Sequence, residues 1–152
     1  MVLSPSVAKR PGGRVLAIDY GRRRLGLAVS DELGMLARPL PTLERTNRRS
    51  DLQRLSRIKE SNGITRIVIG LPLRMDGTHG SMAEEARAFG VRVARALGLP
   101  IEMVDERLTS WEAAESDPRG GSGGHKIKGL IDQRAAVLIL EEHLRSGHTS
   151  RK

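Results

Sequence analysis

The chain is 152 residues long and carries 26 Lys and Arg against 18 Asp and Glu, a formal net charge of +8. It has no cysteine, which excludes disulfides and thiolate metal sites, and no apolar run approaches the roughly 20 residues of a membrane span. The basic excess, mostly arginine, favours a polyanionic partner held through its phosphates. With one Phe, one Trp and one Tyr, base-stacking platforms are scarce, so we expect recognition of backbone charge and shape.

The length is that of a single domain, which we expect over residues 14–146. Residues 1–13 and 147–152 are expected to be tails. The first thirteen residues contain proline and glycine but no apolar core of a signal peptide. The expected location is therefore the cytoplasm.

The first third of the domain predicts three strands in quick succession. Apolar runs predict strands over residues 15–20 and 25–29, joined by a basic turn flanked by glycines. A third strand is expected over residues 35–43, where Pro39 and Pro41 favour an edge position. Three adjacent strands indicate an antiparallel meander.

The chain then alternates between helix and strand. We expect a helix over residues 50–61, a fully covered strand over 67–71, a helix over 81–97 and a strand over 101–106. A capping box at residues 109–112 predicts a short helix, and a glycine-rich loop over 117–124 precedes a final helix over about 130–145. This order predicts the α/β class, with one mixed five-stranded sheet and helices on both faces.

Acidic residues stand at the ends of predicted strands and on the final helix. Asp19 ends the first strand, where burying an acid is costly unless it meets a cation or hydrogen-bond donors. Asp105 and Glu106 end the strand over 101–106 and point to opposite faces, so only one can join Asp19. Asp132 shares the core face of the final helix with Ala135, Ala136, Ile139, Leu140 and His143. Taken alone, the Asp105-Glu106 pair also fits salt bridges and Asp132 fits a helix-dipole role.

Oxygen ligands without a cluster of His or Cys suit Mg²⁺ or Mn²⁺. The four histidines show no zinc-ligand spacing. Two such ions about 4 Å apart can activate water and stabilise the leaving oxygen in phosphodiester cleavage. We therefore expect a Mg²⁺ or Mn²⁺ site built around Asp19.

Several basic or small-residue segments are candidates for phosphate contacts. Arg22, Arg23 and Arg24 form a turn that fits either a phosphate contact or a solvated loop. The segment 69–80 leaves a strand and enters a helix through small residues, as a phosphate-binding loop or an ordinary tight turn does, and it is not a Walker A sequence. Lys126 and Lys128 follow the glycine-rich loop.

Four motifs in order resemble those of the YqgF/RuvX family. They read Asp19-Tyr20-Gly21-x-x-Arg24-Leu25-Gly26-x-Ala28-Val29-Ser30-Asp31, Gly70-Leu71-Pro72-Leu73-x-x-Asp76-Gly77-Thr78, Asp105-Glu106-Arg107-Leu108-Thr109-Ser110 and Lys126-x-Lys128-x-x-x-Asp132-x-x-Ala135-Ala136. The resemblance implies an RNase H-like fold related to that of the Holliday-junction resolvase RuvC. It also implies a metal-dependent nuclease; family members are described as maturing the 5′ end of pre-16S rRNA, and some as junction resolvases.

The chain departs from the family pattern at two places. Ile127 stands at an often basic position, which bears on phosphate binding there. Gly70-Leu71 occupies the place where RNase H-like sites commonly carry a further acid, so the resemblance implies a sparse metal site.

We therefore expect a nuclease acting on structured RNA. The expected catalytic and metal-binding residues are Asp19, Glu106 and Asp132, with Asp105 as the alternative to Glu106. The expected phosphate contacts are Arg22, Arg23, Arg24, Arg107, Lys126 and Lys128. A Holliday-junction resolvase, which needs a dimer, and a non-catalytic nucleic-acid-binding assembly factor are the alternatives. Monomer and homodimer both stay open, and no membrane partner is expected.

Overall fold

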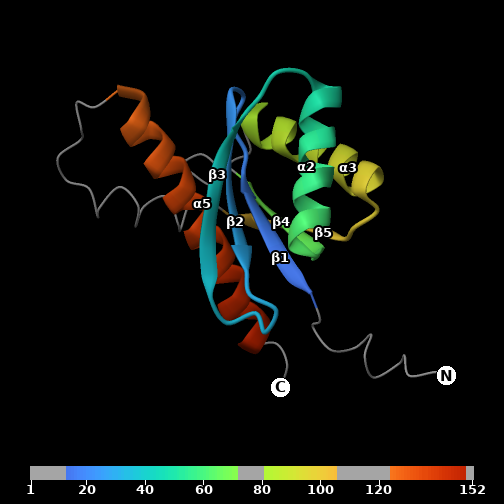
Figure 1. Ribbon diagram of the computed structural model, residues 1–152, viewed down its shortest axis with the longest axis vertical. Helices are drawn as coiled ribbons and strands as arrows, with labels where there is room; N and C mark the ends of the chain where they lie inside the picture. The colour runs from blue at the N-terminus through green and yellow to red at the C-terminus, as the bar shows by residue number, and fades with distance from the viewer. Residues whose placement is uncertain (1–12, 72–80, 106–123, 150–152) are drawn as a thin grey trace.

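The computed structural model describes residues 13–71, 81–105 and 124–149 (Figure 1). The strands are β1 (Arg14–Asp19), β2 (Arg24–Ser30), β3 (Ala37–Glu44), β4 (Ile64–Leu71) and β5 (Ile101–Asp105). The helices are α2 (Arg48–Asn62), α3 (Ser81–Leu97) and α5 (Gly124–Thr149). The described residues contain no helix that is both long enough and apolar enough to cross a bilayer.

The strands form one sheet in the order β3-β2-β1-β4-β5, with β1 at its centre. β1, β2 and β3 pair antiparallel, whereas β4 runs parallel to β1 and to β5. The expected α/β class, the mixed five-stranded sheet and its opening meander are therefore confirmed. β3 is an edge strand, as Pro39 and Pro41 predict.

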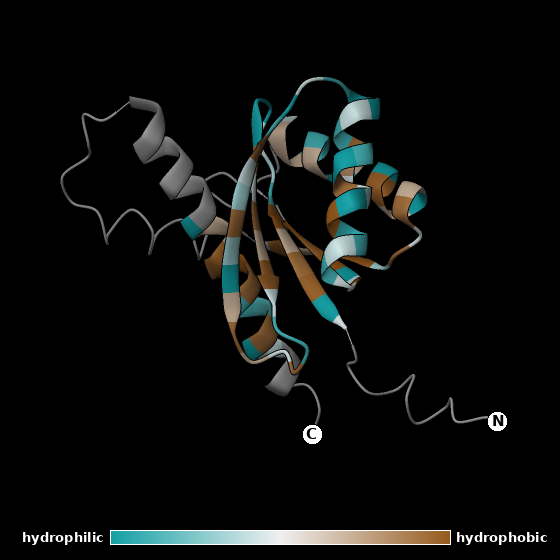
Figure 2. Ribbon diagram, viewed as in Figure 1, coloured by the Kyte–Doolittle hydropathy of each residue, from teal (hydrophilic) through white to brown (hydrophobic). Residues whose placement is uncertain are grey.

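Helices cover both faces of the sheet, with α2 and α3 on one side and α5 on the other (Figure 1). Leu16 and Ile18 of β1 pack into the core under α2 and α3. Ala17 packs into the opposite core with Ala136, Ile139 and Leu140 of α5. Hydrophobic residues accordingly run along the strands between the two helical layers (Figure 2). This alternation fixes which face each residue of β1 occupies.

Several boundaries differ from those expected. α3 has its expected bounds, whereas β3 begins at Ala37 because the Asp31 carboxylate accepts the backbone N–H groups of Met35 and Leu36 in a turn. α2 spans residues 48–62, since the Asn47 side chain caps it and Gly63, at φ 65°, ends it.

The final helix also differs, because α5 begins at residue 124, before the expected start near 130. A helix-interior glycine such as Gly129 costs only about 1 kcal/mol relative to alanine, which does not break the helix. Lys126 and Lys128 therefore lie within α5, not in a segment before it, and α5 runs three residues into the expected C-terminal tail. The expected tail over 1–12, the short helix at 109–112 and the loop over 117–123 lie outside the described residues.

Candidate functional site

Asp19 is the last residue of the central strand and is half-buried. Val15 and Ala17 pack toward α5, so strand alternation places Asp19 on the same side. Its register partners are Gly26 on β2 and Gly70 on β4. The two register positions directly opposite Asp19 therefore carry no side chain.

The carboxyl ends of β1, β4 and β5 meet at the edge of the sheet where Asp19 lies. Asp19 pairs with Gly70, and the next residue of β4, Leu71, pairs with Asp105 of β5. Asp19 and Asp105 thus share this edge at two strands' separation, roughly 10 Å. Glu106 and Arg107 lie outside the described residues.

The two faces of β5 are distinguished by the residues that contact the helices. Ile101 and Met103 pack on the α2 and α3 side. Val104 packs on the α5 side, and the Glu102 carboxylate lies 3.7 Å from Nδ1 of His143 in α5. Even-numbered positions of β5 therefore belong to the face that carries Asp19.

The backbone of Asp132 lies in α5, one helical turn before Ala136. Leu144, near the end of α5, lies beside Gly34 in the turn after β2. This turn is at the end of the strands opposite to Asp19, so the earlier residues of α5 run toward the end that carries Asp19. Ala136 and Ala17 belong to one core cluster, so the Asp132 backbone, one turn earlier in α5, lies toward the end of the sheet that carries Asp19.

The basic turn between β1 and β2 is engaged with α3. The Arg22 guanidinium donates to both Glu85 carboxylate oxygens, at 2.7–3.1 Å, across the molecule's surface. This contact lowers the pKa of Glu85 and raises that of Arg22. Arg23 is exposed and Arg24 is half-buried. The side chains of Lys126 and Lys128 lie outside the described part of the chain.

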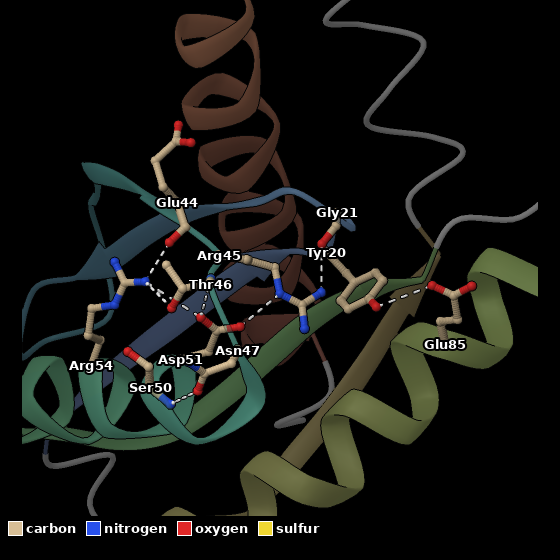
Figure 3. A network of polar contacts seen from close by, with 10 residues as sticks. All are labelled: Tyr20, Gly21, Glu44, Arg45, Thr46, Asn47, Ser50, Asp51, Arg54 and Glu85. Carbon is tan, nitrogen blue, oxygen red and sulfur yellow. Dashed lines mark hydrogen bonds and ion pairs between the residues drawn. The ribbon is translucent and has the colours of Figure 1, made fainter.

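A polar network that the sequence analysis did not find joins this turn to α2 (Figure 3). The Arg45 guanidinium donates to the Asp51 carboxylate at 3.1 Å and to the Gly21 carbonyl at 2.9 Å. It also lies 5.1 Å from the ring centre of Tyr20, whose hydroxyl donates to Glu85. Asp51 follows the N-cap of α2 by a few residues. From sequence alone, an acid at that position is explained by the helix dipole, so the sequence does not predict its contact with Arg45.

The described side chains hold no group of three His, Asp or Glu residues close enough to bind a metal ion. Of the expected ligands, Asp19 is the one whose side chain falls within this part of the chain. Its position fits a hard cation: a half-buried carboxylate at a strand end with glycine on both neighbouring strands. The site could therefore hold Mg²⁺ or Mn²⁺ with additional ligands from the adjacent segments.

The family model described as "RuvX: Holliday junction resolvase" matches residues 13–146. The chain is 46% identical over 132 residues to a protein of Koribacter versatilis named "Putative pre-16S rRNA nuclease", covering 87% of this chain and 86% of that protein. It is 44% identical over 129 residues to a protein of the same name from Synechococcus elongatus, covering 85% and 87%.

The fold is similar to that of Thermus thermophilus RuvC, solved in complex with a Holliday junction substrate. The TM-score is 0.59 at 16% sequence identity, and the alignment covers 89% of this chain and 96% of RuvC. At this identity the likeness establishes the RNase H-like architecture alone.

Proposed function

The chain belongs to the RuvX/YqgF family, and we propose on that basis that it is a divalent-metal-dependent nuclease that matures the 5′ end of pre-16S rRNA. Two relatives named "Putative pre-16S rRNA nuclease" align with more than four fifths of the chain. The observation that carries the proposal is the place of Asp19 at the carboxyl edge of the sheet, between Gly26 and Gly70. No side chain stands at the register position opposite this carboxylate on either neighbouring strand, and a carboxylate oxygen is a ligand that Mg²⁺ and Mn²⁺ prefer.

We assign Asp19, Glu106 and Asp132 as the carboxylates of this site. When bound there, Mg²⁺ or Mn²⁺ would supply an activated water and neutralise charge on the leaving oxygen. Asp19 contributes a rigid anchor because it belongs to the central strand. Asp132 belongs to α5, which packs on the face of the sheet that carries Asp19.

Glu106 is preferred to Asp105 because of the alternation along β5. Glu102 and Val104 lie on the α5 side, whereas Ile101 and Met103 lie on the other. By the same alternation, one further strand residue after Asp105 would face the side of Asp19, which is the reason for choosing Glu106 in this proposal. Loss of activity in Glu106→Gln with retention in Asp105→Asn supports this assignment, and the reverse result favours Asp105.

The substrate is held, in this proposal, by its phosphate backbone. The chain has a net charge of +8 and three aromatic residues, which favours contacts to charge over stacking on bases. Arg23 and Arg24, together with Arg107, Lys126 and Lys128, are assigned to these contacts. Arg22 serves the same purpose through the part of its guanidinium that Glu85 does not occupy. A ribosomal RNA precursor as substrate also agrees with a cytoplasmic location.

The test is cleavage of a precursor 16S rRNA and a four-way DNA junction, side by side, with Mn²⁺. Asp19→Asn is compared with Asp31→Asn, the same change at the opposite edge of the sheet. We expect correct 5′-end cleavage by the wild type and Asp31→Asn and none by Asp19→Asn. Absence of cleavage by the wild type, or full activity in Asp19→Asn, would overturn the proposal.

The description of the family model favours one second candidate, a Holliday-junction resolvase that uses the same carboxylates. Symmetric resolution of a four-way junction needs two sites, hence a dimer. Paired junction cleavage by a dimeric species, without processing of the rRNA precursor, selects the resolvase. RNA binding that survives Asp19→Asn without any cleavage in the wild type instead selects a non-catalytic binding factor.

A further inference from the structure

A second basic cluster lies at the sheet edge that carries Asp19, although it comes from a later part of the chain. β3 ends at Glu44, which pairs with Arg24 at the start of β2. The chain then enters α2, whose first residues, Arg48 and Arg49, are exposed. The fold therefore brings the start of α2 beside the turn of Arg22–Arg24.

Hydrogen bonds of Arg45 join the β1–β2 turn to the start of α2. The Arg45 backbone N–H donates to the Arg23 carbonyl at 2.8 Å, and the Arg45 guanidinium donates to the Gly21 carbonyl. The same guanidinium reaches Asp51 in the first turn of α2 (Figure 3). Arg48 follows Arg45 by three residues, at most about 10 Å of chain.

Several arginines at this edge are not neutralised by protein acids. Asp51 is already engaged by Arg45 and Arg54, and Glu85 by Arg22. Arg23, Arg48 and Arg49 form no ion pair with the residues that the structure describes. Glu44, exposed at the end of β3, offsets one of these three charges and leaves two in excess.

We propose that Arg48 and Arg49 form a second phosphate-binding patch, which holds the RNA strand beside the β1–β2 turn. The proposal rests on the nuclease function proposed above and adds a surface at the start of α2 to it. The ligand is a sugar-phosphate backbone, because arginines without aromatic neighbours read charge and not base identity. The patch lies outside the carboxylate set and affects substrate affinity, not chemistry.

The test measures binding of a labelled single-stranded RNA of mixed sequence to the full chain in EDTA, over a series of salt concentrations. The variant is Arg48→Gln/Arg49→Gln. The charge-matched control is Arg57→Gln/Arg95→Gln, two exposed arginines farther along α2 and at the end of α3. Loss of two phosphate contacts lowers the slope of log K against log salt by about 1.4, and the control leaves the slope unchanged. In cleavage assays we expect the Arg48/Arg49 variant to raise KM with kcat unchanged.

Equal slopes in the variant and the wild type, or equal losses in the variant and the control, would overturn the patch, and so would a wild type that binds no RNA. The two proposals fail separately. A wild type that cleaves the precursor while the variant keeps its slope refutes the patch and leaves the nuclease. A wild type that binds RNA with the expected slope difference but cleaves nothing refutes the nuclease and leaves the patch.

Discussion

Replacement of Arg45 by methionine tests the reasoning about the network that joins the β1–β2 turn to α2. Methionine keeps much of the side chain's length but removes its charge and its donors. The Arg45 side chain is 17% exposed and its partner Asp51 only 3%, so these contacts are made largely away from water. The change removes the hydrogen bonds to Asp51 and to the Gly21 carbonyl and the contact with the Tyr20 ring.

The expected loss of stability follows from these contacts. A hydrogen bond to a charged group contributes about 1.5–3 kcal/mol net, and a cation–π contact about 0.5–1 kcal/mol. Asp51 keeps Arg54 at 3.5 Å and the Thr46 N–H at 3.0 Å, which offset part of the loss. We expect the free energy of unfolding to fall by about 3 kcal/mol. For a chain of this size, that lowers Tm by roughly 6–12 °C.

The assay is urea unfolding followed by circular dichroism, in a double-mutant cycle with Asp51→Asn. The coupling energy between the two positions should be at least about 1 kcal/mol. Arg57→Met, an exposed change on the same helix, is the control and should stay within about 0.5 kcal/mol of wild type. A loss for Arg45→Met as small as that of the control, with no coupling to Asp51→Asn, would refute the reasoning.

Three further predictions concern the turn, pH and metal. Gly21→Ala should cost about 1–3 kcal/mol and abolish cleavage, because the added Cβ would lie 2.5 Å from the Arg24 carbonyl oxygen; a stable and fully active variant contradicts this. Burial lowers the pKa of His143 below 6.5, opposed by Glu102 and assisted by Arg66. The unfolded chain therefore takes up a proton at His143 at a higher pH than the folded chain, so the free energy of unfolding falls as pH drops from 6.5 through the lower folded pKa. Urea titrations should show a steeper loss of stability below pH 6.5 in wild type than in His143→Gln. Mn²⁺ should raise the Tm of wild type and Asp31→Asn but not of Asp19→Asn in a thermal-shift assay; equal shifts in all three contradict a metal site at Asp19.

The architecture was predictable because its signals are local. The apolar stripe of α3 and Gly98, at φ 67°, give both ends of that helix correctly. Apolar runs predict β1 and β4 as strands, and the continuous run of β4 predicts a strand covered on both faces, as the two core clusters confirm. The prolines of β3 place it at the edge of the sheet.

The surroundings of the site were not predictable in the same way, because they depend on contacts between distant segments. Arg22 and Glu85 are 63 residues apart in sequence, and no local pattern pairs them. The glycines beside Asp19 become its neighbours only through the strand register. The network of Arg45 likewise joins three elements, so the link from the β1–β2 turn to α2 emerges from the structure alone.

The central claim is that Asp19 anchors the metal at an RNA-cleaving site. Its most direct test is the single-turnover rate of 5′-end cleavage of precursor 16S rRNA as a function of Mn²⁺ concentration, in wild type and Asp19→Asn. Changes to groups that only support metal ligands cost about 10–100-fold, so loss of a ligand should cost at least about 100-fold. We predict a metal-dependent rate in wild type and a loss of at least that size in Asp19→Asn. A wild-type rate indifferent to metal, or an Asp19→Asn rate within a few-fold of wild type, would contradict the claim.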